Sequence, residues 1–191
     1  MSFERYIQDL NEILSKIARD QVKDLIDLLL KARREGRSIF VIGNGGSAAN
    51  ASHFAQDLAK GCRGALDSEV RFKAVSLTDN IPFITALAND DGYQYVFEQQ
   101  LRTFAKTGDI LVAISGSGNS PNVLRAVDWA NQNGLTTIGV TGFDGGKLKA
   151  LTRHQLHVPL NDMCTAESIH SILFHYVVLE LQKKLNLSCQ G

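Results

Sequence analysis

The chain has 191 residues, of which 44% are hydrophobic and 21% charged, which is ordinary for a globular protein with its own core. Its 20 basic and 20 acidic residues give no net charge, which argues against a protein that binds nucleic acid directly. Three cysteines without CxxC spacing are typical of a reducing compartment. Neither a signal peptide nor a membrane-spanning segment is predicted, so we expect a cytoplasmic protein.

Helical spacing dominates the first part of the chain. Apolar residues recur at this spacing over residues 7–17, and again over 22–30 after a break near Arg19. Gly36 is a typical stop for the second helix. We therefore expect residues 1–36 to form a helical pair that packs either on its own domain or on another subunit.

After this pair, short apolar runs alternate with helical segments. Such runs are typical of buried parallel strands. They predict an α/β fold, a three-layer sandwich with a five-stranded parallel sheet, in one domain over 1–191 whose α/β core spans 37–191. The expected strands are Ser38–Ile42, Phe72–Leu77, Ile110–Ser115, Thr136–Thr141 and Gln155–Val158. The expected helices are Ser47–Lys60, Ile81–Asn89, Tyr93–Ala105, Pro121–Asn133, Gly146–Leu151 and Thr165–Leu185.

A loop of serines and glycines, residues 115–120, follows the third predicted strand and is called the serine loop below. Its glycines allow backbone N–H groups to approach a ligand, and its serines add hydroxyl donors. Pro121 then opens a helix whose start carries partial positive charge, so the loop suits a phosphate. No lysine follows in the Walker pattern, so we expect no nucleotide cofactor. The alternative is a turn with a capped helix, but three hydroxyls and two glycines exceed what capping requires.

A second glycine-rich loop, residues 43–47, follows the first predicted strand. Alone it is also a good turn sequence. Because ligands bind beyond the carboxyl ends of strands in such sheets, this loop and the serine loop are expected to form two walls of one site.

Taken together, these motifs resemble the phosphoheptose isomerases. The segments GNGGSAANASHFAQDLAKG, LTDN, ALANDD, GDILVAISGSGNS and VTGFDGGKL occur in the order and spacing of that family, and the similarity covers nearly the whole chain. The resemblance implies the SIS fold, a homotetramer, and a phosphosugar aldose–ketose isomerase that interconverts sedoheptulose 7-phosphate and D-glycero-D-manno-heptose 7-phosphate. A close branch, the regulators that associate with the replication initiator DnaA, shares these motifs. The alternative is therefore a non-catalytic regulator that binds such a protein partner.

The resemblance also implies which residues hold the sugar phosphate. Gly116 departs from the Ser-Thr-Ser form of the loop, which removes one hydroxyl but keeps the backbone donor. Asp90 has an alternative interpretation as part of a helix-ending turn over 88–92. The implied substrate-binding residues are Asn44, Gly45, Gly46, Ser47, Asn89, Asp90, Ser115, Gly116, Ser117 and Ser120.

Two pairs of polar residues carry the expected acid–base chemistry. His53 and Asp57 lie four residues apart on one helix face, and Glu167 and His175 lie eight apart on the last helix. Such a His/Asp pair alone is usually a solvated helix face, but the resemblance implies a cluster that binds Zn²⁺ and transfers protons. Isomerisation needs a base and an acid, and zinc polarises a carbonyl. We therefore predict a catalytic set of Asp57, Glu167 and His175, with either carboxylate as base and His175 as acid, and zinc ligands His53, Asp57, Glu167 and His175.

This chain departs from the family pattern at two of these positions. Asp57 stands where glutamate is usual, so its carboxylate is set back by on the order of 1 Å, a shift that matters for catalysis. Glu167 stands where glutamine is usual, and its charge should strengthen cation binding. His170 points away from His175 on the same helix and is expected at a surface or an interface.

Overall fold

Five parallel strands form the sheet at the centre of the fold, in the spatial order β2-β1-β3-β4-β5. This computed structural model describes residues 2–65 and 70–187, and it confirms the α/β class and the five-stranded parallel sheet. The edge strands β2 and β5 differ from the prediction by one residue at each end, which is the usual uncertainty of strand boundaries. The strands are β1 (Ser38–Ile42), β2 (Lys73–Ser76), β3 (Ile110–Ser115), β4 (Thr136–Thr141) and β5 (His154–His157).

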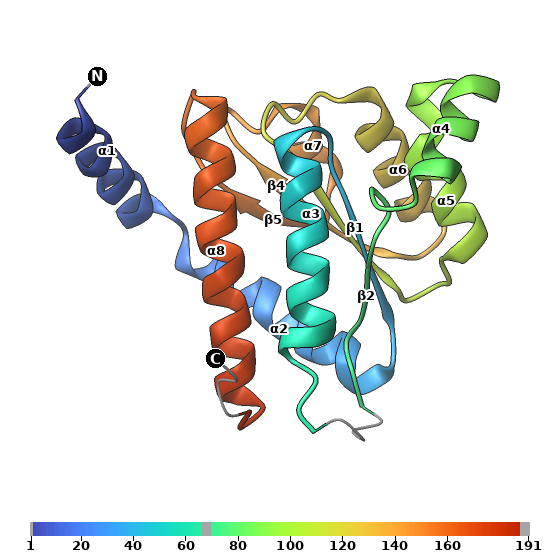
Figure 1. Cartoon of the computed structure of the whole chain (residues 1–191), viewed down its shortest axis with the longest axis horizontal. Helices are drawn as coiled ribbons and strands as arrows, with labels where there is room; N and C mark the ends of the chain where they lie inside the picture. Colours follow the sequence, from blue (N-terminus) through green and yellow to red (C-terminus); the bar gives the residue numbers. More distant parts are fainter. Residues whose placement is uncertain (1, 66–69, 188–191) are drawn as a thin grey trace.

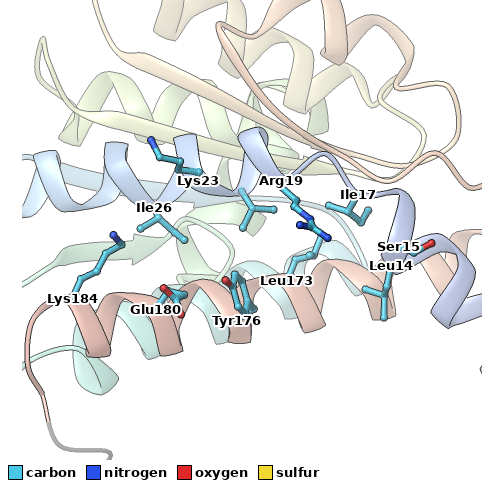
Figure 2. Close-up of a pocket in the computed structure, with 11 residues that line it drawn as sticks. Leu14, Ser15, Ile17, Arg19, Lys23, Ile26, Leu173, Tyr176, Glu180 and Lys184 are labelled. Atoms are coloured by element: carbon cyan, nitrogen blue, oxygen red, sulfur yellow. The ribbon is translucent and has the colours of Figure 1, made fainter.

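Helices cover both faces of this sheet (Figure 1). Such cover is what an all-parallel sheet requires, because its strands are buried on both sides. The α-helices are α1 (Phe3–Lys16), α2 (Arg19–Glu35), α3 (Gly46–Gln56), α4 (Ile81–Asp90), α5 (Val96–Phe104), α6 (Pro121–Gln132), α7 (Gly146–Leu151) and α8 (Met163–Lys184).

The sheet separates two hydrophobic cores. Successive side chains of a strand point to opposite faces, so Ile39 and Val41 of β1 enter the core beside α2, α3 and α8. Phe40 and Ile42 of the same strand enter the core beside α5, α6 and α7. This is the three-layer arrangement expected from the sequence.

Two predicted helices are less regular in the structure. The segment expected as one helix over 47–60 ends as an α-helix at Gln56, and Asp57–Gly61 form a π-helical turn. The segment expected to begin at Tyr93 starts with a 3₁₀ turn, Tyr93–Tyr95, before α5. Short π and 3₁₀ turns do not interrupt the apolar pattern, so periodicity alone cannot reveal them.

The two N-terminal helices differ in how they pack. Helix α2 buries five side chains, including Leu25 and Leu29, against its own domain. Helix α1 extends from one corner of the molecule and buries only Ile13, while Phe3 and Ile7 remain exposed (Figure 1).

None of the helices in the described part of the chain is long and apolar enough to cross a membrane.

Candidate functional site

A pocket of about 250 Å³ opens beyond the carboxyl ends of β1 and β3, where a parallel sheet places its ligands. The loop after β1, the serine loop after β3 and the first turns of α8 line it. All predicted substrate-binding residues except Asn89 and Asp90 belong to this lining. The lining residues are Asn44, Gly45, Gly46, Ser47, Ile114, Ser115, Gly116, Ser117, Ser120, Met163 and Glu167.

Internal hydrogen bonds hold the serine loop in shape. Ser115 is buried, and its Oγ accepts a hydrogen bond from the Gly118 N–H at 3.2 Å. The Oγ atoms of Ser115 and Ser120 lie 3.3 Å apart. Ser120 occupies the N-cap position of α6, yet its side chain makes no capping hydrogen bond. Capping therefore does not account for Ser120, and its hydroxyl is available to a ligand.

Three helices begin at the pocket. Gly46 and Ser47 open α3, Ser120 precedes α6, and Met163 opens α8. A helix start carries partial positive charge and N–H groups without intrahelical partners. The lining contains no lysine or arginine, and Glu167 is its one charged residue. Backbone N–H groups and hydroxyls are therefore the groups that this lining offers to an anion.

A Cβ on either glycine of the serine loop would overlap a neighbouring atom, of the backbone at Gly118 and of a flexible side chain at Gly116. Gly118 has a φ of +66°, and a Cβ there would overlap the carbonyl oxygen of Gly145. A Cβ on Gly116 would overlap the sulfur of Met163. The hydroxyl that is missing at position 116 therefore has no room unless Met163 moves.

Glu167 faces the first turn of α3. A Cβ on Gly46 would overlap its carboxylate, so the glycine allows this close approach. The Asn50 side chain also donates to the Glu167 backbone carbonyl at 2.9 Å, which ties α3 to α8. A carboxylate is favourable beside a helix start. Glu167 thus lies at the pocket, about two turns of α8 or roughly 12 Å from His175.

His53, Asp57 and His175 come together between α3 and α8. Asp57 Oδ2 lies 3.5 Å from His53 Nε2 and 3.8 Å from His175 Nε2. The two imidazole rings meet edge to face with centroids 4.9 Å apart. Phe54 and Phe174 stack at 4.2 Å beside them and hold the two helices together. Both imidazoles are 51% exposed, so a ligand can reach the cluster.

The same three side chains are suited to a zinc ion. Their potential ligand atoms all lie within 4.8 Å of one another. Imidazole and carboxylate are common zinc ligands, and tetrahedral zinc holds neighbouring ligand atoms roughly 3.4 Å apart. The separations of 3.5 and 3.8 Å are close to this value. His53, Asp57 and His175 therefore fit zinc with one position open, whereas Glu167, the fourth predicted ligand, lies outside this cluster.

Asn89 and Asp90 lie outside the pocket lining, at the end of α4. Both are exposed, and the Asn89 side-chain amide donates to Asp90 Oδ1 at 2.7 Å. The N–H groups of Asp91 and Gly92 bond to the Leu87 carbonyl, which closes the helix in the way the alternative interpretation expects. Their contact with a sugar stays a prediction.

Sequence reasoning missed the side chains that join the two loops. Asn44 and Asn122 exchange two hydrogen bonds of 2.9 Å, and the Tyr93 hydroxyl donates to Asn44 Oδ1 at 2.9 Å. These partners lie 78 and 49 positions apart in the chain, so no local pattern connects them. The sequence signal that could have indicated the pair is Asn122 itself, a polar residue in the first turn of α6 at a position that faces the core.

His170 is fully buried on α8, so the expectation of a surface or interface position was wrong. Its Nε2 lies 3.2 Å from the Thr141 carbonyl oxygen, and its Nδ1 has no hydrogen-bond partner among the described residues. Burial lowers the pKa of His170 to about 4, which keeps the ring neutral near pH 7. The neutral ring joins α8 to the carboxyl end of β4.

Known proteins resemble this chain over most of its length. The SIS domain family matches residues 3–142. The phosphoheptose isomerase of Clostridium acetobutylicum is 35% identical over 187 residues, which cover 95% of this chain and 94% of the relative. That of Pelobacter propionicus is 39% identical over 173 residues, with coverages of 88% and 89%.

Solved structures agree with this comparison. The phosphoheptose isomerase from Neisseria gonorrhoeae has a TM-score of 0.83 and 32% identity, and the match covers 94% of this chain and 98% of that one. A phosphoheptose isomerase from Francisella tularensis has a TM-score of 0.82 and 26% identity, with coverages of 95% and 94%. Both confirm the SIS-type fold expected from the sequence.

Proposed function

The chain belongs to the phosphoheptose isomerase family of SIS-domain proteins, and from this premise we infer that it is an enzyme that isomerises phosphosugars. We propose sedoheptulose 7-phosphate as its substrate and D-glycero-D-manno-heptose 7-phosphate as its product. The relatives named above are isomerases, which gives no support to a regulator acting through DnaA. We also propose that residues 1–191 make one SIS domain.

One spatial relation carries the proposal: α3 and α8 both begin at the pocket and lie side by side as far as the His–Asp cluster (Figure 1). His53 follows Gly46 by seven residues, roughly 10 Å along α3. A heptose 7-phosphate has eight bonds between C1 and phosphorus, which span roughly 9 Å when extended. A phosphate bound in the pocket therefore allows C1 and C2 to lie at Asp57 and His175.

The proposed reaction moves a proton from C1 to C2. Asp57 accepts the C1 proton, and the electron pair of that bond forms the double bond of an enediol while His175 protonates the C2 carbonyl oxygen. Return of a proton to C2 and loss of the proton from O1 give the aldose. The other candidate base, Glu167, lies at the phosphate end, so the geometry favours Asp57.

We further propose that Zn²⁺ binds to His53, Asp57 and His175, with Glu167 as a fourth ligand if its side chain turns away from Gly46. The ion would polarise the C2 carbonyl as a Lewis acid, in place of the proton from His175, because an imidazole nitrogen that binds zinc has no proton to donate. A carboxylate has two oxygens, so Asp57 can bind a cation with one and accept a proton with the other.

The proposal includes a homotetramer in the cytoplasm. Ile172, Tyr176 and Leu179 form an exposed apolar stripe on α8 around His175, and such patches mark protein interfaces. A partner on this stripe would border the His–Asp cluster. Cys62 and Cys164 are unpaired, as expected in a reducing compartment. Light scattering should give the mass of four chains, and a monomer would contradict this part.

Turnover of sedoheptulose 7-phosphate by the purified protein tests the function directly. We expect turnover that a chelator abolishes and added zinc restores. Turnover that is insensitive to chelator would support the isomerase and refute the metal. Absence of turnover, together with tight binding to DnaA, would support the regulator instead.

A further inference from the structure

A pair of side-chain amides joins the first loop of the pocket to the helix start that follows the serine loop. Asn44 Nδ2 donates to Asn122 Oδ1 at 2.9 Å, and Asn122 Nδ2 donates back to Asn44 Oδ1 at 2.9 Å. Two parallel hydrogen bonds fix both the distance and the relative orientation of their carriers. Asn44 immediately precedes Gly45 of the first loop, and Asn122 lies two residues after Ser120 of the serine loop. The pair therefore ties the two loops together beyond the point where the paired strands β1 and β3 end.

The start of α6 sets the orientation of the Asn122 amide. Its Oδ1 also accepts the Val123 N–H at 3.0 Å, and the side chain is only 2% exposed. With Oδ1 directed at this N–H, Nδ2 is directed at Asn44. Removing Asn44 leaves the buried amide of Asn122 without a partner for its Nδ2, which is costly, whereas removing Asn122 frees the half-buried Asn44 side chain to turn.

Tyr93 extends the pair to a third segment. Its hydroxyl donates to Asn44 Oδ1 at 2.9 Å, so this oxygen accepts two hydrogen bonds and has no lone pair left for a ligand. The Tyr93 side chain is largely exposed, so this hydrogen bond rather than packing ties it to the pocket. Tyr93 follows closely on Asn89 and Asp90, the predicted sugar-binding residues.

We propose that Asn122 is a positioning residue that sets the spacing of the two phosphate-binding loops, and that Tyr93 couples the sugar-side segment to them. The inference rests on the proposed function, since it takes a sugar phosphate as the ligand. It also assigns Asn44 a new role, because its side-chain oxygen serves the pair and only one of its N–H groups stays free for the sugar.

The variant Asn122→Ala tests the spacing, and Asn131→Ala is its matched control. Asn131 lies on the same helix, donates to the Leu151 carbonyl at 2.9 Å and accepts from Thr137 at 2.8 Å, and it does not line the pocket. Both variants should lower the melting temperature. Asn122→Ala should weaken binding of inorganic phosphate, measured by calorimetry, by about tenfold, and Asn131→Ala should not. Wild-type phosphate affinity in folded Asn122→Ala would overturn the proposal.

Two further variants separate the parts of the network. If the amides act as a pair, Asn44→Ala combined with Asn122→Ala should weaken phosphate binding no more than the more damaging single change. Fully additive losses would contradict the pairing. Tyr93→Phe should raise KM for sedoheptulose 7-phosphate severalfold with unchanged phosphate affinity, and an unchanged KM would overturn the role of Tyr93.

Phosphate binding tests the spacing of the loops and turnover tests the isomerase, so the two proposals can fail independently. A wild-type protein that binds phosphate without isomerising the sugar would refute the proposed function, and the comparison of Asn122→Ala with Asn131→Ala would still decide the spacing. Turnover with wild-type phosphate affinity in Asn122→Ala would overturn this inference alone. A wild-type protein that does not bind phosphate would overturn this inference, and turnover of the sugar would decide the proposed function separately.

Discussion

Asp57 Oδ2 lies 3.8 Å from His175 Nε2, which joins the end of α3 to the middle of α8. Asp57 opens a π-helical turn, and such a turn changes which side chains share a helix face. His53, four residues earlier, remains within 3.5 Å of the same oxygen. The proposed proton acceptor and donor therefore face each other at a local irregularity of the helix.

Replacing Asp57 by asparagine should lower kcat by about 10²–10⁴-fold, because an amide cannot accept a proton. Asp57→Glu keeps a carboxylate that can accept a proton but moves it by on the order of 1 Å, so it should change kcat by less than Asp57→Asn does. Steady-state kinetics measures both, with circular dichroism as a control for folding. Unchanged kcat in Asp57→Asn would remove it as the base.

Glu167→Gln should strengthen binding of inorganic phosphate severalfold. Glu167 is the one charged residue in the pocket lining. Its carboxylate and a phosphate bound in the same partly exposed pocket should repel each other by on the order of 1 kcal/mol. Calorimetry measures the affinity, and Glu180→Gln on the same helix is the control. Weaker phosphate binding in Glu167→Gln would show that the carboxylate supports the pocket rather than opposing the anion.

The fold and the loops of the pocket were open to prediction because their signals are local. All six residues of β3 are buried, so the strand reads as a continuous apolar run, and the serine loop follows it directly. The amide pair of Asn44 and Asn122 left no such signal, because its partners lie 78 positions apart.

The last helix, α8, shows a second reason why some positions could not be predicted from the sequence. Its buried residues recur in step with His170, at Ala166, Phe174 and Val178. Ile172, Tyr176 and Leu179 are apolar but exposed, so apolar residues occur on both sides of the helix and do not mark which side is the core. His170 was placed wrongly for this reason. The position of Glu167 depends on the empty space above Gly46, which only the packing of α3 against α8 reveals.

Gly116→Thr should weaken phosphate binding although it adds the hydroxyl that the family loop carries. A Cβ at this position would overlap the sulfur of Met163, so the side chain displaces either Met163 or the loop. Combining it with Met163→Ala should recover the loss or exceed wild-type affinity, with Met163→Ala alone as the control. Calorimetry measures the affinity of each variant for inorganic phosphate. A double variant that binds phosphate as weakly as Gly116→Thr alone would contradict the steric explanation.

His170 should make the fold less stable in acid. Burial lowers its pKa from 6.5 to about 4, so between these values the unfolded chain binds more protons than the folded one. The free energy of unfolding therefore rises with pH through this window: the contribution is complete above about pH 6.5 and is lost as the pH falls toward 4. His157, whose pKa burial also lowers, acts in the same direction.

Urea denaturation at several pH values from 7 to 4 measures this contribution. The variant His170→Gln keeps an N–H donor for the Thr141 carbonyl but does not titrate, so its stability should fall less than that of the wild type, by up to a few kcal/mol. His157→Gln should reduce the fall by a smaller amount, because its pKa is shifted less. Other titrating groups are common to all three proteins and cancel in the comparison. Parallel stability curves for the wild type and His170→Gln would show that the buried imidazole does not remain neutral in the folded state.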